Sequence, residues 1–236
     1  RRQAELSREL QQAGSPGQIA SYKDRAVSIA RGHILGKTMN EVTSQVVAMV
    51  LRADLTGSVS LLTNGERILM QSALDDWGGQ VESATVRSEF QTLLDDSAGL
   101  TDQGIGAAGL AMLEYRKADG NSLGWNQGCS TVVDYVNQAV ARGLNEPMLL
   151  LWKGQCLRKR GDALTAYQAF SKAATMLEGG DFEETLLHAQ LAHHGVGTTL
   201  VALVASEELP PGEDSATALQ EALSELREAA RIRGER

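Results

Sequence analysis

The stretch Trp152–Leu177, WKGQCLRKRGDALTAYQAFSKAATML, carries the clearest repeating pattern in this chain of 236 residues. We interpret it as two consecutive helices. Such a pair is either a surface that binds another protein or only a well-packed helical hairpin. The rest of the sequence has to decide between these two interpretations.

The composition favours helices throughout. Aromatic residues make up only 4% of the chain, so Leu, Val, Ala and Met must form the core. Strands prefer aromatic and β-branched residues, and we find no strand pair or hairpin turn. The predicted fold is therefore all-α. We divide it into a polar tail or short helix at 1–14, an irregular helical region at 15–119, a glycine-rich loop at 120–128, helical hairpins at 129–209 and a capping helix at 210–236.

Local signals predict where several helices begin. Asn40 has the position of an N-cap, as does Thr63 or Asn64 for the following helix. Pro147 fits the first turn of a helix, where its missing N–H costs nothing. In the last helix, which Ser215 can cap, one apolar stripe is predicted with charged residues outside it. The stripe consists of Ala216, Leu219, Leu223, Leu226 and Ala230, and the charged residues are Glu221, Glu225, Arg227 and Glu228.

The segment Pro147–Gly180 resembles one tetratricopeptide (TPR) repeat, a unit of two antiparallel helices. The matching positions are Gly154, Leu157, Gly161, Ala166, Phe170 and Ala173. Departures are Leu150 in place of the first aromatic, Lys153 in place of Leu, and Glu178 in place of the terminal Pro. The flanking segments keep the helix–turn–helix outline without the signature, so the resemblance implies one recognisable repeat between two degenerate ones. A hairpin with coincidental Gly and Ala is the alternative.

The resemblance also implies a binding surface. In stacked repeats the first helices line a concave face, which points to Met148, Leu151, Gln155 and Arg158. Modules that clamp a peptide's terminal carboxylate have Lys and Asn where this chain has Leu151 and Gln155, so chaperone-tail binding is not expected. The basic run Arg158, Lys159 and Arg160 suits an acidic partner, or is simply a solvated helix end.

Charge and hydropathy restrict the partners. The net charge is −8 and the pI about 5.1, which disfavours nucleic acid, because phosphate binding needs a surplus of Lys and Arg. No apolar run reaches the ~18 residues that span a bilayer, and no signal peptide is visible, although a membrane complex remains a possible partner. We expect the two cysteines, Cys129 and Cys156, to be reduced thiols. The expected location is soluble, in a reducing compartment: the cytoplasm, or an organelle interior after loss of a targeting segment.

Two motifs imitate nucleotide loops. Gly104–Gly109, GIGAAG, has the spelling of a dinucleotide loop but lacks a preceding apolar strand, so we interpret it as a helix start with small residues for close packing. Gly32–Thr38, GHILGKT, is one residue short of a phosphate loop. A nucleotide-binding regulator or small enzyme that uses Lys37 and Thr38 is the alternative function.

No other catalytic or metal site is predicted. His188, His193 and His194 lack the i, i+4 spacing of a zinc helix. The pairs Asp75–Asp76 and Asp95–Asp96 suit solvated loop carboxylates better than acid/base work. We expect no cofactor and no enzymatic activity. The leading hypothesis is a non-catalytic helical scaffold, or a peripheral subunit of a larger assembly, whose partners are other protein subunits.

Overall fold

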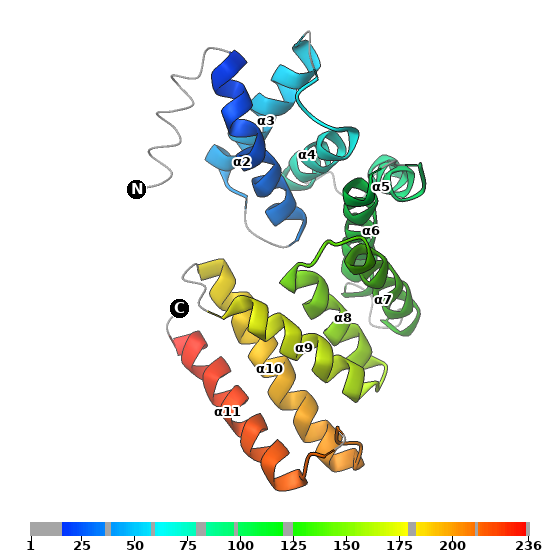
Figure 1. Cartoon of the computed structure of the whole chain (residues 1–236), viewed down its shortest axis with the longest axis vertical. Coiled ribbons are helices and arrows are strands. Elements are labelled where there is room, and N and C mark those ends of the chain that lie inside the picture. The colour runs from blue at the N-terminus through cyan, green and yellow to red at the C-terminus, as the bar shows by residue number, and fades with distance from the viewer. Residues whose placement is uncertain are drawn as a thin grey trace. The chain divides into compact units, whose positions relative to one another are not determined.

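A computed structural model describes residues 16–35, 39–57, 60–78, 84–96, 99–119, 125–178, 183–210 and 212–234. Within these ranges every regular element is an α-helix and no strand occurs, so the predicted all-α fold is confirmed (Figure 1). The helices are α2 (Pro16–Ile34), α3 (Glu41–Thr56), α4 (Asn64–Trp77), α5 (Ala84–Asp96), α6 (Leu100–Asp119), α7 (Trp125–Ala141), α8 (Pro147–Lys159), α9 (Ala163–Leu177), α10 (Glu183–Ser206) and α11 (Ser215–Gly234). The predicted tail at 1–14 lies outside the described residues.

The chain forms two compact units. Unit 1 contains residues 1–110 and 141–144, and unit 2 contains residues 111–140 and 145–236. The division falls inside α6. Helix α7 begins at Trp125, within the predicted loop, and it lies close to α6 at Gly128, where an added Cβ would lie 3.0 Å from the Cβ of Ala118.

Helix ends in unit 1 follow the predicted capping signals. Asn40 accepts a hydrogen bond from the Thr43 N–H at 3.0 Å and caps α3. Thr63, rather than Asn64, caps α4: its hydroxyl accepts from the Glu66 N–H at 3.1 Å, and the Glu66 carboxylate accepts from the Thr63 N–H at 2.8 Å. Such reciprocal bonds satisfy N–H groups that the helix itself leaves without a partner.

Asp54 holds the connection between α3 and α4. One carboxylate oxygen accepts from the backbone N–H groups of Leu61 at 2.6 Å and Leu62 at 2.9 Å, and the other from Nε of Arg67 at 2.9 Å. Its side chain is almost entirely buried. Burial alone would raise the pKa of Asp54, but the hydrogen bonds from Leu62, Arg67 and Leu61 outweigh burial and lower it.

Replacing Asp54 with alanine is expected to lower the free energy of unfolding by about 2–3 kcal/mol, because two backbone N–H groups lose their acceptor. Arg67 is partly exposed and can turn to water, which limits the loss. Because the folded pKa is depressed, the contribution is present at neutral pH and is lost as the pH falls below about 4 toward the folded pKa. Urea unfolding at several pH values measures both effects. The exposed Asp95→Ala serves as control, and equal losses in both variants would contradict the prediction.

The GIGAAG segment lies inside α6, and the prediction of close packing is confirmed. A Cβ on Gly106 would lie 2.6 Å from the carbonyl oxygen of Phe90, and one on Gly109 would lie 2.5 Å from the Phe90 ring. The glycines therefore let α6 approach α5 at backbone distance. A pyrophosphate loop would need the same glycines in a turn after a strand, and they lie here within a continuous helix.

Unit 2 is organised around Phe170 on α9, which is completely buried. Its ring fills the space beside two glycines, Gly154 on α8 and Gly195 on α10, where added Cβ atoms would lie 2.8 Å and 2.5 Å from ring carbons. The turn between α8 and α9 places Gly161 at φ +82°, a backbone conformation that residues other than glycine rarely adopt. The predicted pair of helices is thus present, with small residues where the helices approach.

The expectation of two reduced cysteines is wrong. Cys129 on α7 and Cys156 on α8 form a disulfide, with their Cα atoms 4.9 Å apart and both residues fully buried. Sequence reasoning missed the bond because the two residues are 27 positions apart and only the packing of α7 on α8 brings them together. The expectation of a reducing compartment rested on free thiols, and this pair does not support it.

The last helix turns a different face inward from the one predicted. The buried residues of α11 are Ala218, Ala222, Ala229 and Ile232, whereas Leu219 and Leu223 of the predicted stripe are largely exposed. Gly197 on α10 lets α11 approach closely: a Cβ there would lie 2.9 Å from the carbonyl oxygen of Ala222 and 2.7 Å from Cγ of Leu226, a leucine of the predicted stripe that does reach α10. Asp214, not Ser215, caps the helix by accepting from the N–H groups of Ala216 and Thr217.

Candidate protein-binding face on helices α8 and α10

The residues predicted to bind a partner lie along α8, but they are not equally accessible. Leu151 is only 3% exposed and belongs to the core of unit 2. Met148, Gln155 and Arg158 are half-buried, and Lys159 is exposed at the end of the helix. The accessible part of the predicted set therefore combines the apolar Met148 with polar and basic side chains, and Leu151 does not offer its side chain to a partner.

Arg158 connects α8 to α10. Its Nη2 donates to Oε1 of Gln155 at 2.8 Å, and its Nη1 donates to the hydroxyl of Thr198 on α10 at 3.1 Å. That hydroxyl in turn donates to the carbonyl oxygen of His194 at 2.8 Å. These bonds hold the guanidinium in one place, and it keeps further N–H groups on its planar fork that suit a carboxylate.

Helix α10 exposes apolar side chains on the face that carries Thr198. Leu191 is 36% exposed and Val201 45% exposed, and they lie seven residues before and three residues after Thr198, on the same side of the helix. We call Gln155, Arg158, Leu191, Thr198 and Val201 the α8–α10 face. A fixed cation between half-exposed apolar side chains can bind a segment that offers a carboxylate beside apolar residues.

Sequence reasoning named the α8 members of this face and missed those on α10. The only available signal was the recurrence of 191, 194, 198 and 201 at intervals of three and four residues, which defines a helix face but not whether that face is covered. Which side of α10 stays open depends on where α8, α9 and α11 pack.

The phosphate-loop-like segment is only partly described. Lys37 and Thr38 lie outside the described residues. The residues before them, from Asp24 to Arg31, belong to α2, so the strand that a phosphate loop would follow is replaced by a helix. Asp54 lies on α3, and its carboxylate accepts hydrogen bonds from the backbone N–H groups of Leu61 and Leu62.

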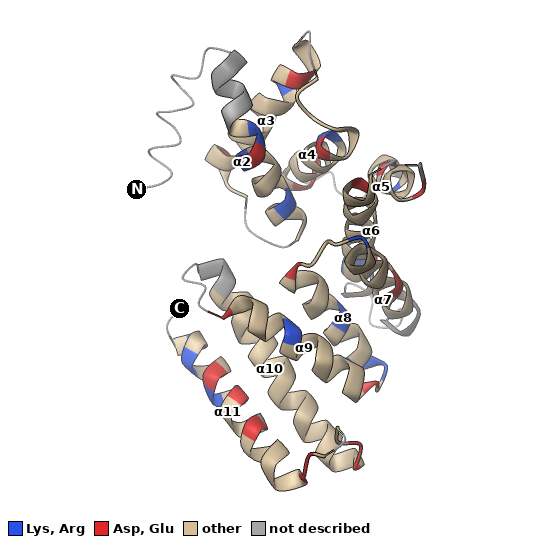
Figure 2. Ribbon diagram, viewed as in Figure 1, with Lys and Arg blue, Asp and Glu red and all other residues tan. Residues whose placement is uncertain are grey.

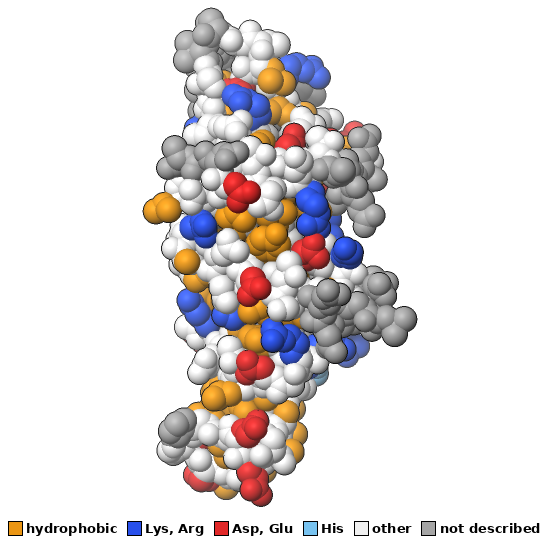
Figure 3. All heavy atoms as spheres, turned by 90° about the vertical axis from the view of Figure 1, so that its right-hand side faces the viewer, with side chains coloured by type: hydrophobic (Ala, Val, Ile, Leu, Met, Phe, Trp, Pro, Cys, Tyr) orange, Lys and Arg blue, Asp and Glu red, His pale blue; other side chains and the backbone are white. Residues whose placement is uncertain are grey.

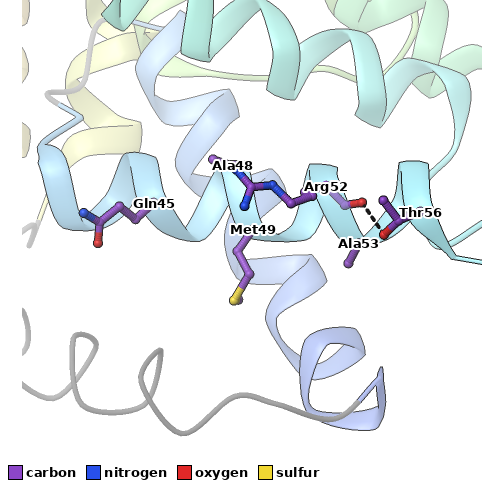
Figure 4. A pocket seen from close by; sticks show the side chains of 6 residues that line it. All are labelled: Gln45, Ala48, Met49, Arg52, Ala53 and Thr56. Carbon is purple, nitrogen blue, oxygen red and sulfur yellow. Dashed lines mark hydrogen bonds between the residues drawn. The ribbon is translucent and has the colours of Figure 1, made fainter.

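A groove with a volume of about 420 Å³ runs along one side of α3 (Figure 4). The described residues that line it all belong to this helix and are Gln45, Ala48, Met49, Arg52, Ala53 and Thr56. The Thr56 hydroxyl donates to the Arg52 carbonyl oxygen at 2.8 Å, a bond within the helix. Among these described residues there is one cation and no acid or nucleophilic pair, so they assign no chemistry to the groove.

The three C-terminal histidines occupy different environments on α10. His188 is buried, Nδ1 of His193 lies 2.6 Å from Oε2 of Glu225 on α11, and His194 is exposed. Within the part of the chain that the structure describes, no three His, Cys, Asp or Glu side chains are grouped to hold a metal ion.

On the face drawn in Figure 3, Lys and Arg side chains are interspersed with Asp and Glu over most of the view. Of the described helices, none combines the length and hydrophobicity that a bilayer span requires. Comparison of the chain with protein-family models, with curated proteins and with solved structures finds no match.

Proposed function

We propose that this chain is a non-catalytic helical scaffold, or a peripheral subunit of an assembly, that binds another protein through the α8–α10 face. One observation carries the proposal: Arg158 is bonded to Thr198 across two helices, between exposed Leu191 and Val201 on α10. Exposed apolar side chains beside a positioned cation are typical of surfaces that bind proteins. The resemblance of 147–180 to a TPR unit supports it too, because α8 and α10 have the places of first helices.

The partner would be a segment with an acidic residue flanked by apolar ones. Arg158 would donate two N–H groups to the carboxylate in a bidentate pair, while Leu191 and Val201 would cover the neighbouring apolar side chains. Lys159 and Arg160, both exposed at the end of α8, add positive charge there in a chain whose net charge is −8. Local attraction of this kind speeds association and determines orientation more than it adds affinity.

The Arg158→Glu and Val201→Glu variants test this face. Proteins that copurify with the wild type from native extract are identified by mass spectrometry, and the direct binding of each is titrated. Both variants are expected to weaken binding about tenfold or more. Arg158→Glu would repel the carboxylate of the partner, and Val201→Glu would place a charge in the apolar contact. Arg52→Glu, at an exposed arginine on α3, is the matched control, with helicity checked by circular dichroism. Unchanged binding by folded Arg158→Glu and Val201→Glu would reject the proposal.

A further inference from the structure

Helix α11 has a second apolar face that its own unit leaves open. Leu219 is 45% exposed and Leu223 48% exposed, and both belong to the stripe formed by Ala216, Leu219, Leu223, Leu226 and Ala230. Leu226 at the edge of this stripe is half-buried, and its Cγ would lie 2.7 Å from a Cβ on Gly197 of α10. The members of this stripe are three and four residues apart in alternation, which is the spacing of the seam between paired helices in a coiled coil. We call it the outer stripe.

The inward face of the same helix is made of smaller side chains. Ala218, Ala222 and Ala229 are buried there, with Ile232 near the end of the helix. Close packing on Gly197 of α10 accounts for this choice within the unit, but it leaves Leu219 and Leu223 without a cover. Because leucine gains more than alanine from burial, a second contact over these two leucines would add apolar burial.

The two ends of α11 carry opposite charge. The turn before it holds Glu207, Glu208, Glu213 and Asp214, and the second half of the helix exposes Arg227, Arg231 and Arg233 (Figure 2). The same half also carries two acids: Glu228 pairs with Arg231, and Glu225 lies against Nδ1 of His193. With three arginines against two acids, it keeps an excess of one positive charge, so the helix has a strongly acidic start and a weakly basic second half.

We infer that the outer stripe binds a second copy of this chain, with the two α11 helices antiparallel about a two-fold axis near residue 221. In this arrangement Leu219 lies against Leu223 of the partner subunit, and the acidic start of each helix lies beside the basic end of the other. A parallel pair would place acid against acid and base against base. One surface that is complementary to itself in this way satisfies the symmetry of a two-fold dimer.

The first test is sedimentation equilibrium of the full chain. The wild type is expected to dimerise at micromolar concentrations, and Leu219→Glu and Leu223→Glu are each expected to raise the dimer dissociation constant about tenfold or more. Leu55→Glu on α3 is the matched control, because Leu55 is 66% exposed and lies outside the outer stripe. Circular dichroism confirms that each variant keeps its helicity. A wild type that stays monomeric, or an equal effect of Leu55→Glu, would overturn the inference.

Crosslinking tests the register. In the antiparallel pair, mixing Leu219→Cys with Leu223→Cys and oxidising with glutathione disulfide is expected to join the two variants, while each variant alone joins poorly. Native Cys129 and Cys156 are buried in their own disulfide and contribute little background. Efficient joining of Leu219→Cys to itself would indicate parallel helices and overturn the proposed pairing. A monomeric wild type would leave binding at the α8–α10 face untouched, since Arg158→Glu tests that face separately.

Discussion

Replacing Phe170 with alanine is expected to lower the free energy of unfolding by about 3–5 kcal/mol. The ring is completely buried and lies against the backbone at Gly154 and Gly195, on two different helices. Backbone cannot move in as a flexible side chain would, so most of the ring's volume would remain as a cavity. Urea unfolding followed by circular dichroism measures the loss. Met176→Ala, a partly exposed position on the same helix, is expected to cost about 0.5 kcal/mol or less.

The contact between Phe170 and Gly195 is tested by a double-mutant cycle. Gly195→Ala should destabilise the wild type by about 1–3 kcal/mol, because the new Cβ would lie 2.5 Å from Cδ1 of Phe170. In a Phe170→Leu background, the methyl group that Gly195→Ala adds enters the space that the ring has left. Gly195→Ala should therefore cost much less there than in the wild type. Additive losses would mean that the two residues do not touch, and would contradict the packing described for unit 2.

Removing the disulfide is expected to cost about 3.5 kcal/mol in the Cys129→Ala, Cys156→Ala double variant. The bond closes a loop across a sequence separation of 27, and cross-linking a loop of that length restricts the unfolded chain by about this amount. Alanine is preferred to serine because both sites are fully buried and a hydroxyl there would add a cost of its own.

Chemical reduction measures the contribution of the same disulfide to stability independently. Wild type unfolded in dithiothreitol should lose as much stability as the double variant, and the double variant should not respond to dithiothreitol. Thiol alkylation of protein unfolded without reductant, followed by mass spectrometry, counts free cysteines. Two alkylated thiols would contradict the bond between α7 and α8.

The helix ends were predictable because their causes are local. The cap of α3 at Asn40 depends on Thr43, three residues away, and Pro147 begins α8 where its missing N–H costs nothing. Gly161 occupies the turn that only a glycine forms without strain. Each of these signals involves residues within one helical turn of one another, so it can be recognised in the sequence without knowledge of the tertiary structure.

The candidate face was predictable only in part. Helical spacing placed Gln155 and Arg158 on one side of α8, which agrees with their hydrogen bond. The same spacing included Leu151, which is buried, because periodicity defines the side of a helix but not what covers it. The α10 half of the face, with Thr198 and Val201, could not be predicted, because it depends on the packing of α8 against α10.

The sequence by itself determined that this protein is all-α and where its best-capped helices begin, since helix formation and capping depend on bonds between residues three or four positions apart. Only the tertiary structure decided that Cys129 pairs with Cys156, that Phe170 meets glycines from two helices, and that α11 turns its alanines inward. These choices depend on contacts between residues tens of positions apart. On α11 both faces are apolar, and the close approach at Gly197 brings the alanine face and the neighbouring Leu226 against α10.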